Sequence, residues 1–224
     1  MENDRNYDIP CAFPCARART TVRRFMIPVR RLLAAFAVAC LGLGVPAAHA
    51  ATYTIDPDHS TVGFRIRHLL SYVYGTFDQF EGVIEYEPGK PETWKAEATI
   101  QAARVNTRVE QRDKHLRTKE FFDVEQFPTI TFTSIEVTDV ADDHAKLHGT
   151  LTLHGVARPV VLDLAIHGVA KDPWGNVRAG FTGTTAVDRK EFGLTWNQAL
   201  ETGGVLVGDQ VDLTLEIEAI QAEQ

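Results

Sequence analysis

Cysteine is scarce in this 224-residue chain, and all of it lies near the beginning. The three cysteines are Cys11, Cys15 and Cys40, so the chain after residue 50 contains no thiol. Thiol catalysis, cysteine-bound metals and disulfides are therefore excluded for that part of the chain. A domain of this length is large enough to be stable without disulfides, including in an oxidising compartment.

Basic residues are also few after residue 50. From Ala51 onward there are 16 basic and 27 acidic residues, a net charge of −11. Binding to phosphate backbones or to an anionic membrane surface needs a basic footprint. The composition therefore argues against nucleic acid as a partner.

Motifs of common enzyme classes are missing as well. There is no glycine-rich phosphate loop after a strand, no HExxH and no CxxC. Asp58, His59 and Ser60 are consecutive, and three neighbours in sequence cannot orient one another as a catalytic triad. We expect no enzymatic activity and no cofactor.

The longest apolar run is only fourteen residues, from Leu32 to Val45. It follows Arg30 and Arg31 and precedes Ala48-His49-Ala50, which is the three-part pattern of a secretory signal peptide over residues 26–50. Fourteen residues fall short of the roughly 20 that span a bilayer, so we expect no membrane span in the mature chain. Residues 1–25 are interpreted as an upstream extension, with Met26 as the alternative start. A twin-arginine signal and a lipoprotein site at Cys40 are weaker alternatives.

Alternating apolar and polar residues dominate the chain from residue 51 to the end. A short first strand over 52–55 precedes eight long ones, over 61–68, 76–86, 94–101, 130–137, 147–153, 160–166, 177–187 and 211–217. Such strands predict an antiparallel sheet with one wet face, and closure into an up-and-down barrel removes its exposed edges. Leu69 to Tyr74 interrupts the alternation and is expected to form a helical turn or lid. Phe77 is out of phase, which indicates a bulge or bend.

One polar helix is predicted in the middle of the chain. Thr107 and Glu110 have the spacing of a capping box, and Val109 and Leu116 form one narrow apolar stripe. The adjacent Phe121 and Phe122 follow. We expect this helix to cover one side or end of the barrel.

The segment RDKHLRTKEFFDVEQFPTITF, residues 112–132, resembles the most characteristic part of the YceI-like family of bacterial periplasmic proteins. YTIDPDHSTVGFRIRHL (53–69), GTFDQFEGVIEY (75–86), LHGTLTLHGVARPVVLDL (147–164) and DRKEFGL (188–194) match in the expected order. The resemblance covers essentially all of 52–220, within a predicted domain of 51–224. It implies a lipocalin-like barrel, periplasmic localisation and a polyisoprenoid, isoprenoid quinone or other long-chain lipid as ligand.

Large apolar side chains on the inward register are the candidate ligand contacts. They are Phe64, Ile66, Phe80, Ile84, Phe121, Phe122, Phe132, Leu151, Leu164, Phe181 and Trp196, with His68 at the end of its strand. Trp94 shares this register, and small residues such as Gly82, Ala98 and Gly149 are interleaved. Small side chains inside a barrel leave volume, so the pattern predicts an apolar cavity.

Five polar residues have two interpretations each. They are His59, Arg112, Asp113, His115 and Arg189. Arg112 and Asp113 could pair with each other or with Arg189, either as structural contacts or to hold a polar headgroup. His59, His68 and His115 could converge as a metal or catalytic site. The remaining hypotheses are a filled-barrel stress-response protein without a ligand and a homodimer.

Overall fold

The computed structural model describes residues 50–201 and 203–223. The predicted upstream extension, the predicted signal peptide except Ala50, and all three cysteines lie outside these residues. In the described part of the chain, no helix is both long and apolar enough to cross a membrane.

Eleven strands and one short α-helix make up the described chain. The strands are β1 (Ala51–Ile55), β2 (Thr61–His68), β3 (Ser71–Phe77), β4 (Phe80–Tyr86), β5 (Lys95–Gln101), β6 (Val105–Asn106), β7 (Thr129–Thr138), β8 (His144–Leu153), β9 (Val156–Lys171), β10 (Val177–Asp188) and β11 (Val207–Gln221). The helix α1 (Glu110–Leu116) lies between β6 and β7. Short 3-10 helices occupy Pro57–His59, Pro91–Thr93, Ala102–Arg104 and Arg189–Phe192.

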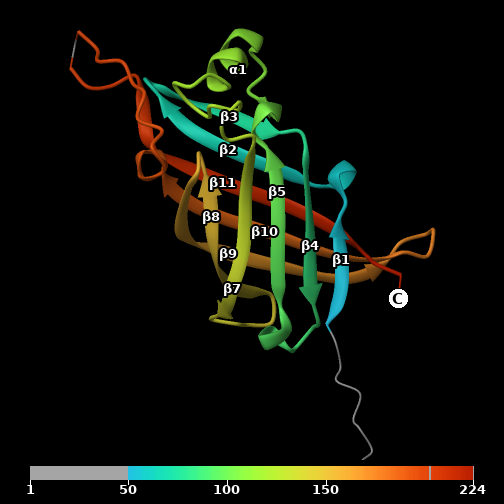
Figure 1. The fold of residues 1–224 in the computed structure, drawn as a ribbon. Helices are drawn as coiled ribbons and strands as arrows, with labels where there is room; N and C mark the ends of the chain where they lie inside the picture. Colours follow the sequence, from blue (N-terminus) through green and yellow to red (C-terminus); the bar gives the residue numbers. More distant parts are fainter. Residues whose placement is uncertain (1–49, 202, 224) are drawn as a thin grey trace, which may run out of the picture. The chain divides into compact units, whose positions relative to one another are not determined.

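Eight of the strands form a closed antiparallel ring. The order is β1-β4-β5-β7-β8-β9-β10-β11, and pairing of β1 with β11 closes it (Figure 1). The predicted antiparallel up-and-down barrel of about eight strands with one inserted helix is confirmed. Closure leaves this ring without a free edge.

Three interruptions divide the N-terminal part of the barrel wall into two tiers. Asp56–Ser60 separates β1 from β2, residues 78–79 separate β3 from β4, and Ala102–Arg104 separates β5 from β6. The first tier, β1-β4-β5, belongs to the closed ring. The second tier, β2-β3-β6, continues from β11 through β2. The bend predicted at Phe77 is the β3–β4 interruption.

The second tier ends at β6, which has only two residues. Among the described residues β6 pairs with β3 and not with β7. The chain from Thr107 to Pro128, including α1, follows at this point and lies over that end of the barrel (Figure 1). The prediction that the helix covers one end of the barrel therefore agrees with its position.

Two local predictions were wrong. Leu69 to Tyr74 is not a helical turn or lid, because Leu69 and Leu70 turn the chain and the alternating Tyr72-Val73-Tyr74 pairs with β2 as part of β3. The capping box is absent, because α1 starts at Glu110 and the Thr107 hydroxyl donates a hydrogen bond to Asp113 instead.

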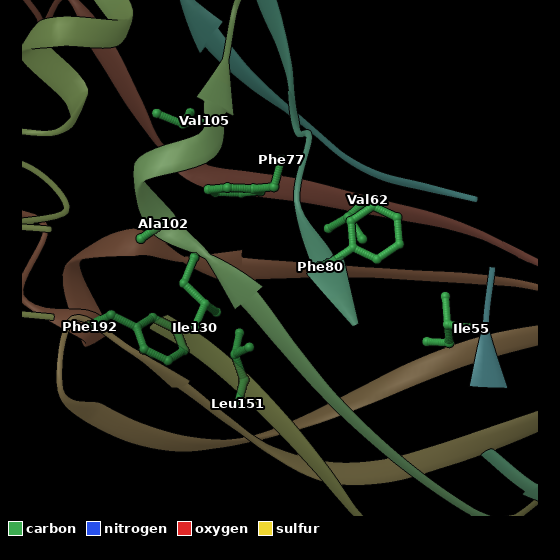
Figure 2. Close-up of a cluster of buried hydrophobic side chains, with 9 residues drawn as sticks. All are labelled: Ile55, Val62, Phe77, Phe80, Ala102, Val105, Ile130, Leu151 and Phe192. Carbon is green, nitrogen blue, oxygen red and sulfur yellow. The ribbon is translucent and has the colours of Figure 1, made fainter. Parts of the chain in front are cut away.

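Buried apolar residues form two clusters at different heights of the barrel. The larger cluster contains Ile55, Val62, Phe77, Phe80, Ala102, Val105, Ile130, Leu151 and Phe192 (Figure 2). The smaller cluster, called the floor below, consists of Tyr53, Tyr86, Ala179, Phe181 and Ala219, with Trp94 packed against it. The space between the larger cluster and α1 holds the candidate site.

Candidate functional site

A cavity of about 610 Å³ lies inside the barrel. Ligand pockets in proteins typically have about 300–1,000 Å³, so this volume accommodates a small molecule. Its wall comes mainly from aliphatic and aromatic side chains of β2, β7, β8, β9 and β11, together with residues of α1 and of the segment after it.

Nine of the twelve predicted ligand contacts line this cavity. They are Phe64, Ile66, His68, Phe80, Phe121, Phe122, Phe132, Leu151 and Trp196. Ile84, Leu164 and Phe181 face inward but do not line it. Phe181 belongs to the floor, Ile84 packs against both clusters, and Leu164 pairs with Gly183 on β10. Side-chain alternation predicted their face correctly but not their height along the barrel.

Several inward residues of central strands are only half-buried. Phe64 and Ile66 on β2 and Leu213 and Leu215 on β11 show this intermediate exposure, although solvent-facing residues alternate with them. Inward apolar side chains in a filled barrel would lose nearly all of their exposed surface. Their residual exposure is to the cavity, since all four line it.

Three glycines of the barrel wall, Gly75, Gly82 and Gly149, admit neighbouring side chains and do not line the cavity themselves. A side chain at Gly149 would overlap the ring of Phe132, and one at Gly75 would overlap the ring of Phe64. At Gly82 a β-carbon would approach the Ile55 side chain to 2.7 Å. The expectation that these small residues leave free volume is therefore wrong at Gly82 and Gly149.

The floor closes one end of the barrel with aromatic rings that pack edge to face or tilted against one another. The Tyr86 ring lies 4.9 Å from that of Trp94 and 5.0 Å from that of Phe181, centroid to centroid. The Trp94 indole N–H donates a 2.7 Å hydrogen bond to the Glu87 carbonyl. Burial raises the pKa of both Tyr53 and Tyr86. Neither tyrosine was predicted to seal the barrel, although Tyr53 alternates with the exposed Thr52 and Thr54.

The two adjacent phenylalanines occupy different surroundings. Phe122 packs against the larger core cluster, with its ring 5.7 Å from that of Phe77. Phe121 packs against Trp196 and His115, each at a centroid distance of 5.0 Å. They lie in a turn, so both reach the cavity.

Polar side chains reach the cavity mainly from α1. Gln111, Arg112 and His115 come from the helix, and His68 from the end of β2. Arg112 donates hydrogen bonds of 2.7 and 2.8 Å to the hydroxyl and carbonyl oxygens of Thr107. The Asp113 carboxylate accepts the Thr107 backbone N–H at 2.8 Å. Arg112 and Asp113 thus both bind Thr107 and fix the start of the helix, in place of the expected pairing with each other or with Arg189.

Arg189 is a buried structural cation at the cavity wall. Its side chain is 4% exposed and lies 3.4 Å from Asp209. It donates hydrogen bonds to the carbonyl oxygens of Gly208 at 2.8 Å, Trp196 at 2.9 Å and Leu194. Burial lowers the pKa of Arg189, and Asp209 and Asp188 act in the opposite direction. These bonds hold the segment that carries Trp196 against β11.

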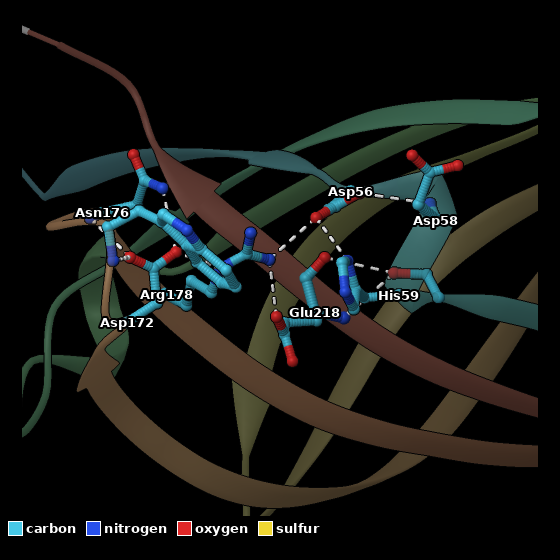
Figure 3. Close-up of polar contacts among 9 residues, drawn as sticks. Asp56, Asp58, His59, Asp172, Asn176, Arg178 and Glu218 are labelled. Atoms are coloured by element: carbon cyan, nitrogen blue, oxygen red, sulfur yellow. Dashed lines mark hydrogen bonds and ion pairs between the residues drawn. The ribbon is translucent and has the colours of Figure 1, made fainter.

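The three histidines do not converge. His68 and His115 line the cavity, whereas His59 lies apart from it and bonds Asp56 at 2.8 Å. In residues 50–201 and 203–223 the single group with metal-ligand spacing is Asp56, His59 and Glu218. The Arg178 guanidinium lies among them, 2.7 Å from Asp56 and 2.6 Å from Glu218 (Figure 3). A fixed positive charge there opposes a metal cation.

The barrel, its cavity and its helix agree with a match at the level of the whole domain. The YceI-like domain model matches residues 53–219. The chain belongs to the YceI-like family. A UPF0312 protein of Azotobacter vinelandii is 37% identical over 196 residues, covering 86% of this chain and 99% of that protein.

Solved structures of YceI-like proteins show the same architecture. The Campylobacter jejuni YceI protein is 34% identical, with a TM-score of 0.61 over 70% of this chain and 91% of its own. A polyisoprenoid binding domain from Saccharophagus degradans, implicated in plant cell wall breakdown, has a TM-score of 0.59 over 77% of this chain and 99% of its own. At 16% identity, that second likeness concerns the fold.

Proposed function

We propose that this protein binds a long apolar molecule inside its barrel, with an isoprenoid lipid or isoprenoid quinone as the favoured ligand class. The observation that carries the proposal is the cavity of about 610 Å³ with a mainly aliphatic and aromatic wall. Transfer of apolar surface from water into such a wall is favourable in proportion to the area buried. The relationship to YceI-like proteins and the fold shared with a polyisoprenoid binding domain support the same class.

The two ends of the cavity differ, which suggests one orientation for the ligand. The end away from α1 is lined by apolar side chains such as Ile55, Phe80 and Leu215, and the α1 end presents His68, Gln111 and His115. An unpaired polar headgroup costs free energy in an apolar interior, so it favours the end where hydrogen-bonding partners exist. The chain of the ligand would then point toward the floor and its headgroup toward α1.

The protein would act as a periplasmic binder or carrier without enzymatic activity. This part of the proposal rests on the predicted signal peptide and on the lack of enzyme motifs. The filled-barrel alternative requires an interior without a continuous void. The cavity of about 610 Å³ is therefore evidence against this alternative. The metal-site alternative requires three histidines to converge, and His59 lies apart from the two histidines that line the cavity.

The test is to identify what the cavity holds. The chain would be purified from the periplasm without detergent, extracted with organic solvent and analysed by mass spectrometry. We expect a long-chain lipid near one equivalent per protein. Recovery of no lipid, together with no binding of an added polyprenyl alcohol, would refute the proposal.

Two neighbouring residues of β11 provide a matched pair of variants. Leu213 lines the cavity, whereas Thr214 is exposed on the outer face. Leu213→Trp should fill the cavity and reduce the bound lipid, while Thr214→Trp should leave the lipid content unchanged. Equal lipid content in both variants would place the ligand elsewhere.

A further inference from the structure

The tip of the β2–β3 hairpin exposes two leucines. Leu70 is 91% exposed and Leu69 is 44% exposed. Leu69 also has a positive φ of 48°, in the left-handed region that bulky residues rarely adopt. Two-residue hairpin turns favour Asn-Gly or Asp-Gly for this reason. The stability of the turn therefore does not explain why Leu69 and Leu70 occupy it. Backbone strain of this kind is common at functional positions.

The hairpin tip is continuous with the mouth of the cavity. The Leu69 backbone N–H donates a 3.0 Å hydrogen bond to the Leu206 carbonyl, which joins the tip to the segment before β11. Leu206 lines the cavity, as do His68 and Val73 on either side of the turn. Val205, beside Leu206, is 52% exposed. Exposed Leu69, Leu70 and Val205 therefore border the opening.

Tyrosine and arginine side chains lie behind the apolar tip. Tyr72 is 45% exposed and Tyr74 is 63% exposed on β3. The guanidinium carbons of Arg65 and Arg67 lie 5.1 and 5.4 Å from the centre of the Tyr72 ring. Tyrosine is enriched at membrane interfaces, and arginine extends its charge toward the headgroups from there.

The charge of this hairpin differs from that of the rest of the domain. Residues 59–77 contain Arg65 and Arg67 and no acidic residue, although the domain carries a net charge of −11. Arg65 is paired with Asp212 at 2.7 Å. The negative charge of the domain opposes binding to an anionic membrane surface. The hairpin has no acidic side chain of its own, so it can approach a layer of neutral headgroups without electrostatic repulsion from this segment.

We propose that Leu69, Leu70 and Val205 insert into the surface of a zwitterionic phospholipid bilayer and place the cavity mouth against it. This inference rests on the proposed function, because a lipid that leaves a bilayer through such a contact reaches the cavity without crossing water. Three small apolar contacts give weak, reversible association, as a carrier requires.

The test is flotation of the full chain with vesicles of phosphatidylcholine and phosphatidylethanolamine. Leu70→Ser should weaken vesicle binding about tenfold or more, since it removes the most exposed apolar side chain of the tip. Trp174→Ser is the matched control, because Trp174 is 82% exposed on the turn between β9 and β10. It should bind vesicles like the wild type, and thermal melts of all three proteins should coincide.

A second measurement separates this inference from the proposed function. A polyprenyl alcohol delivered from ethanol without vesicles should bind Leu70→Ser as tightly as the wild type, while its extraction from vesicles should be slower. Absence of wild-type vesicle binding, or equal loss in both variants, would overturn the membrane contact and leave ligand binding standing. Absence of ligand binding in every variant would overturn the proposed function instead.

The alternative partner for the exposed hairpin is a second copy of the chain, and sedimentation velocity tests this alternative. The β3 edge pairs with β6 only at Thr76 and Phe77, so residues 71–75 lie along an edge that another strand can join. The decisive result would be a dimeric wild type that does not bind vesicles and a monomeric Leu70→Ser variant. This result would assign the surface to self-association and overturn the membrane contact.

Discussion

The ring of Phe132 on β7 fills the place where a side chain of Gly149 on β8 would stand. A β-carbon at Gly149 would overlap two ring carbons of Phe132 and would lie 2.8 Å from the Thr133 carbonyl oxygen. Phe132 also lines the cavity. A change at Gly149 should therefore affect both stability and the shape of the ligand site.

Gly149→Ala should lower the free energy of unfolding by about 1–3 kcal/mol, the usual effect of overpacking a core. It should also weaken ligand binding, because the Phe132 ring must move. The control is Gly183→Ala, where the new β-carbon would lie 3.5 Å from Leu164 and Leu215, an ordinary contact. Urea denaturation and lipid retention measure the two effects, and equal destabilisation by both changes would contradict this packing argument.

Phe121→Ala and Phe122→Ala should separate ligand binding from stability. Phe122 packs against Phe77 and the larger core cluster, so its truncation should approach the ~3–5 kcal/mol typical of a core phenylalanine. Phe121 contacts Trp196 and His115 beside the cavity, so its truncation should destabilise the ligand-free protein less and still reduce bound lipid. Denaturation of delipidated protein and mass spectrometry of extracts provide the comparison. Equal large losses of stability with unchanged lipid would make both residues ordinary core.

Arg189→Met should detach the segment that carries Trp196. The change leaves the carbonyls of Gly208, Leu194 and Trp196 without their shared donor, and hydrogen bonds to a charged group contribute about 1.5–3 kcal/mol each. We expect destabilisation of at least ~2 kcal/mol and altered tryptophan fluorescence. Arg189→Lys should not restore stability, because an ammonium lacks the planar fork that reaches several carbonyls. Full rescue by lysine would show that charge alone matters.

Acid should destabilise the protein through the carboxylates around Arg178. The hydrogen bond from Arg178 lowers the pKa of Asp56. Burial alone would raise the pKa of Asp172, but hydrogen bonds from Arg178, Asn176 and two backbone N–H groups outweigh it and hold that pKa well below its usual range. Both groups therefore stabilise the fold above the unfolded-state pKa of about 3.9, and this contribution is lost as pH falls through the folded values.

The urea midpoint of the wild type should accordingly be flat from about pH 7 to pH 5 and fall below about pH 4. Arg178→Gln should start lower and fall less steeply, because the carboxyl pKa values return toward their ordinary range. Asp172→Asn should remove part of the acid-dependent loss. Parallel curves for all three proteins would assign the acid sensitivity to other groups.

Alternation in the sequence was sufficient to predict the barrel and the inward faces of its strands. Phe64 and Ile66 on β2, and Leu213 and Leu215 on β11, face inward as their spacing indicates. Alternation carries no information about height along the barrel, which depends on strand register. Contact of the Phe181 ring with the Tyr86 ring, at a centroid distance of 5.0 Å, places Phe181 in the floor, and this could not be read from β10 alone.

Turns were the other source of error. Leu69-Leu70 lacks the glycine or asparagine that usually marks a hairpin, so the strand after it was missed. His59 lies in a 3-10 helix that follows Asp56, where a hydrogen bond to the Asp56 carboxylate directs the ring to Arg178 and Glu218 (Figure 3). Long-range pairs such as Arg178 with Asp56, 122 residues apart, have no signature in a single sequence.

The two tiers of the barrel wall give the molecule unequal resistance to local opening. β1, β4 and β5 are each paired on both sides within the closed ring, whereas β6 has two residues and β3 has a largely unpaired outer edge. Opening free energies vary along a protein in cooperative units, and elements with few partners have the lowest values. Backbone amides of β3 and β6 should thus exchange with deuterium before those of β4 and β5, so the end under α1 can admit a bulky ligand while the floor end stays folded.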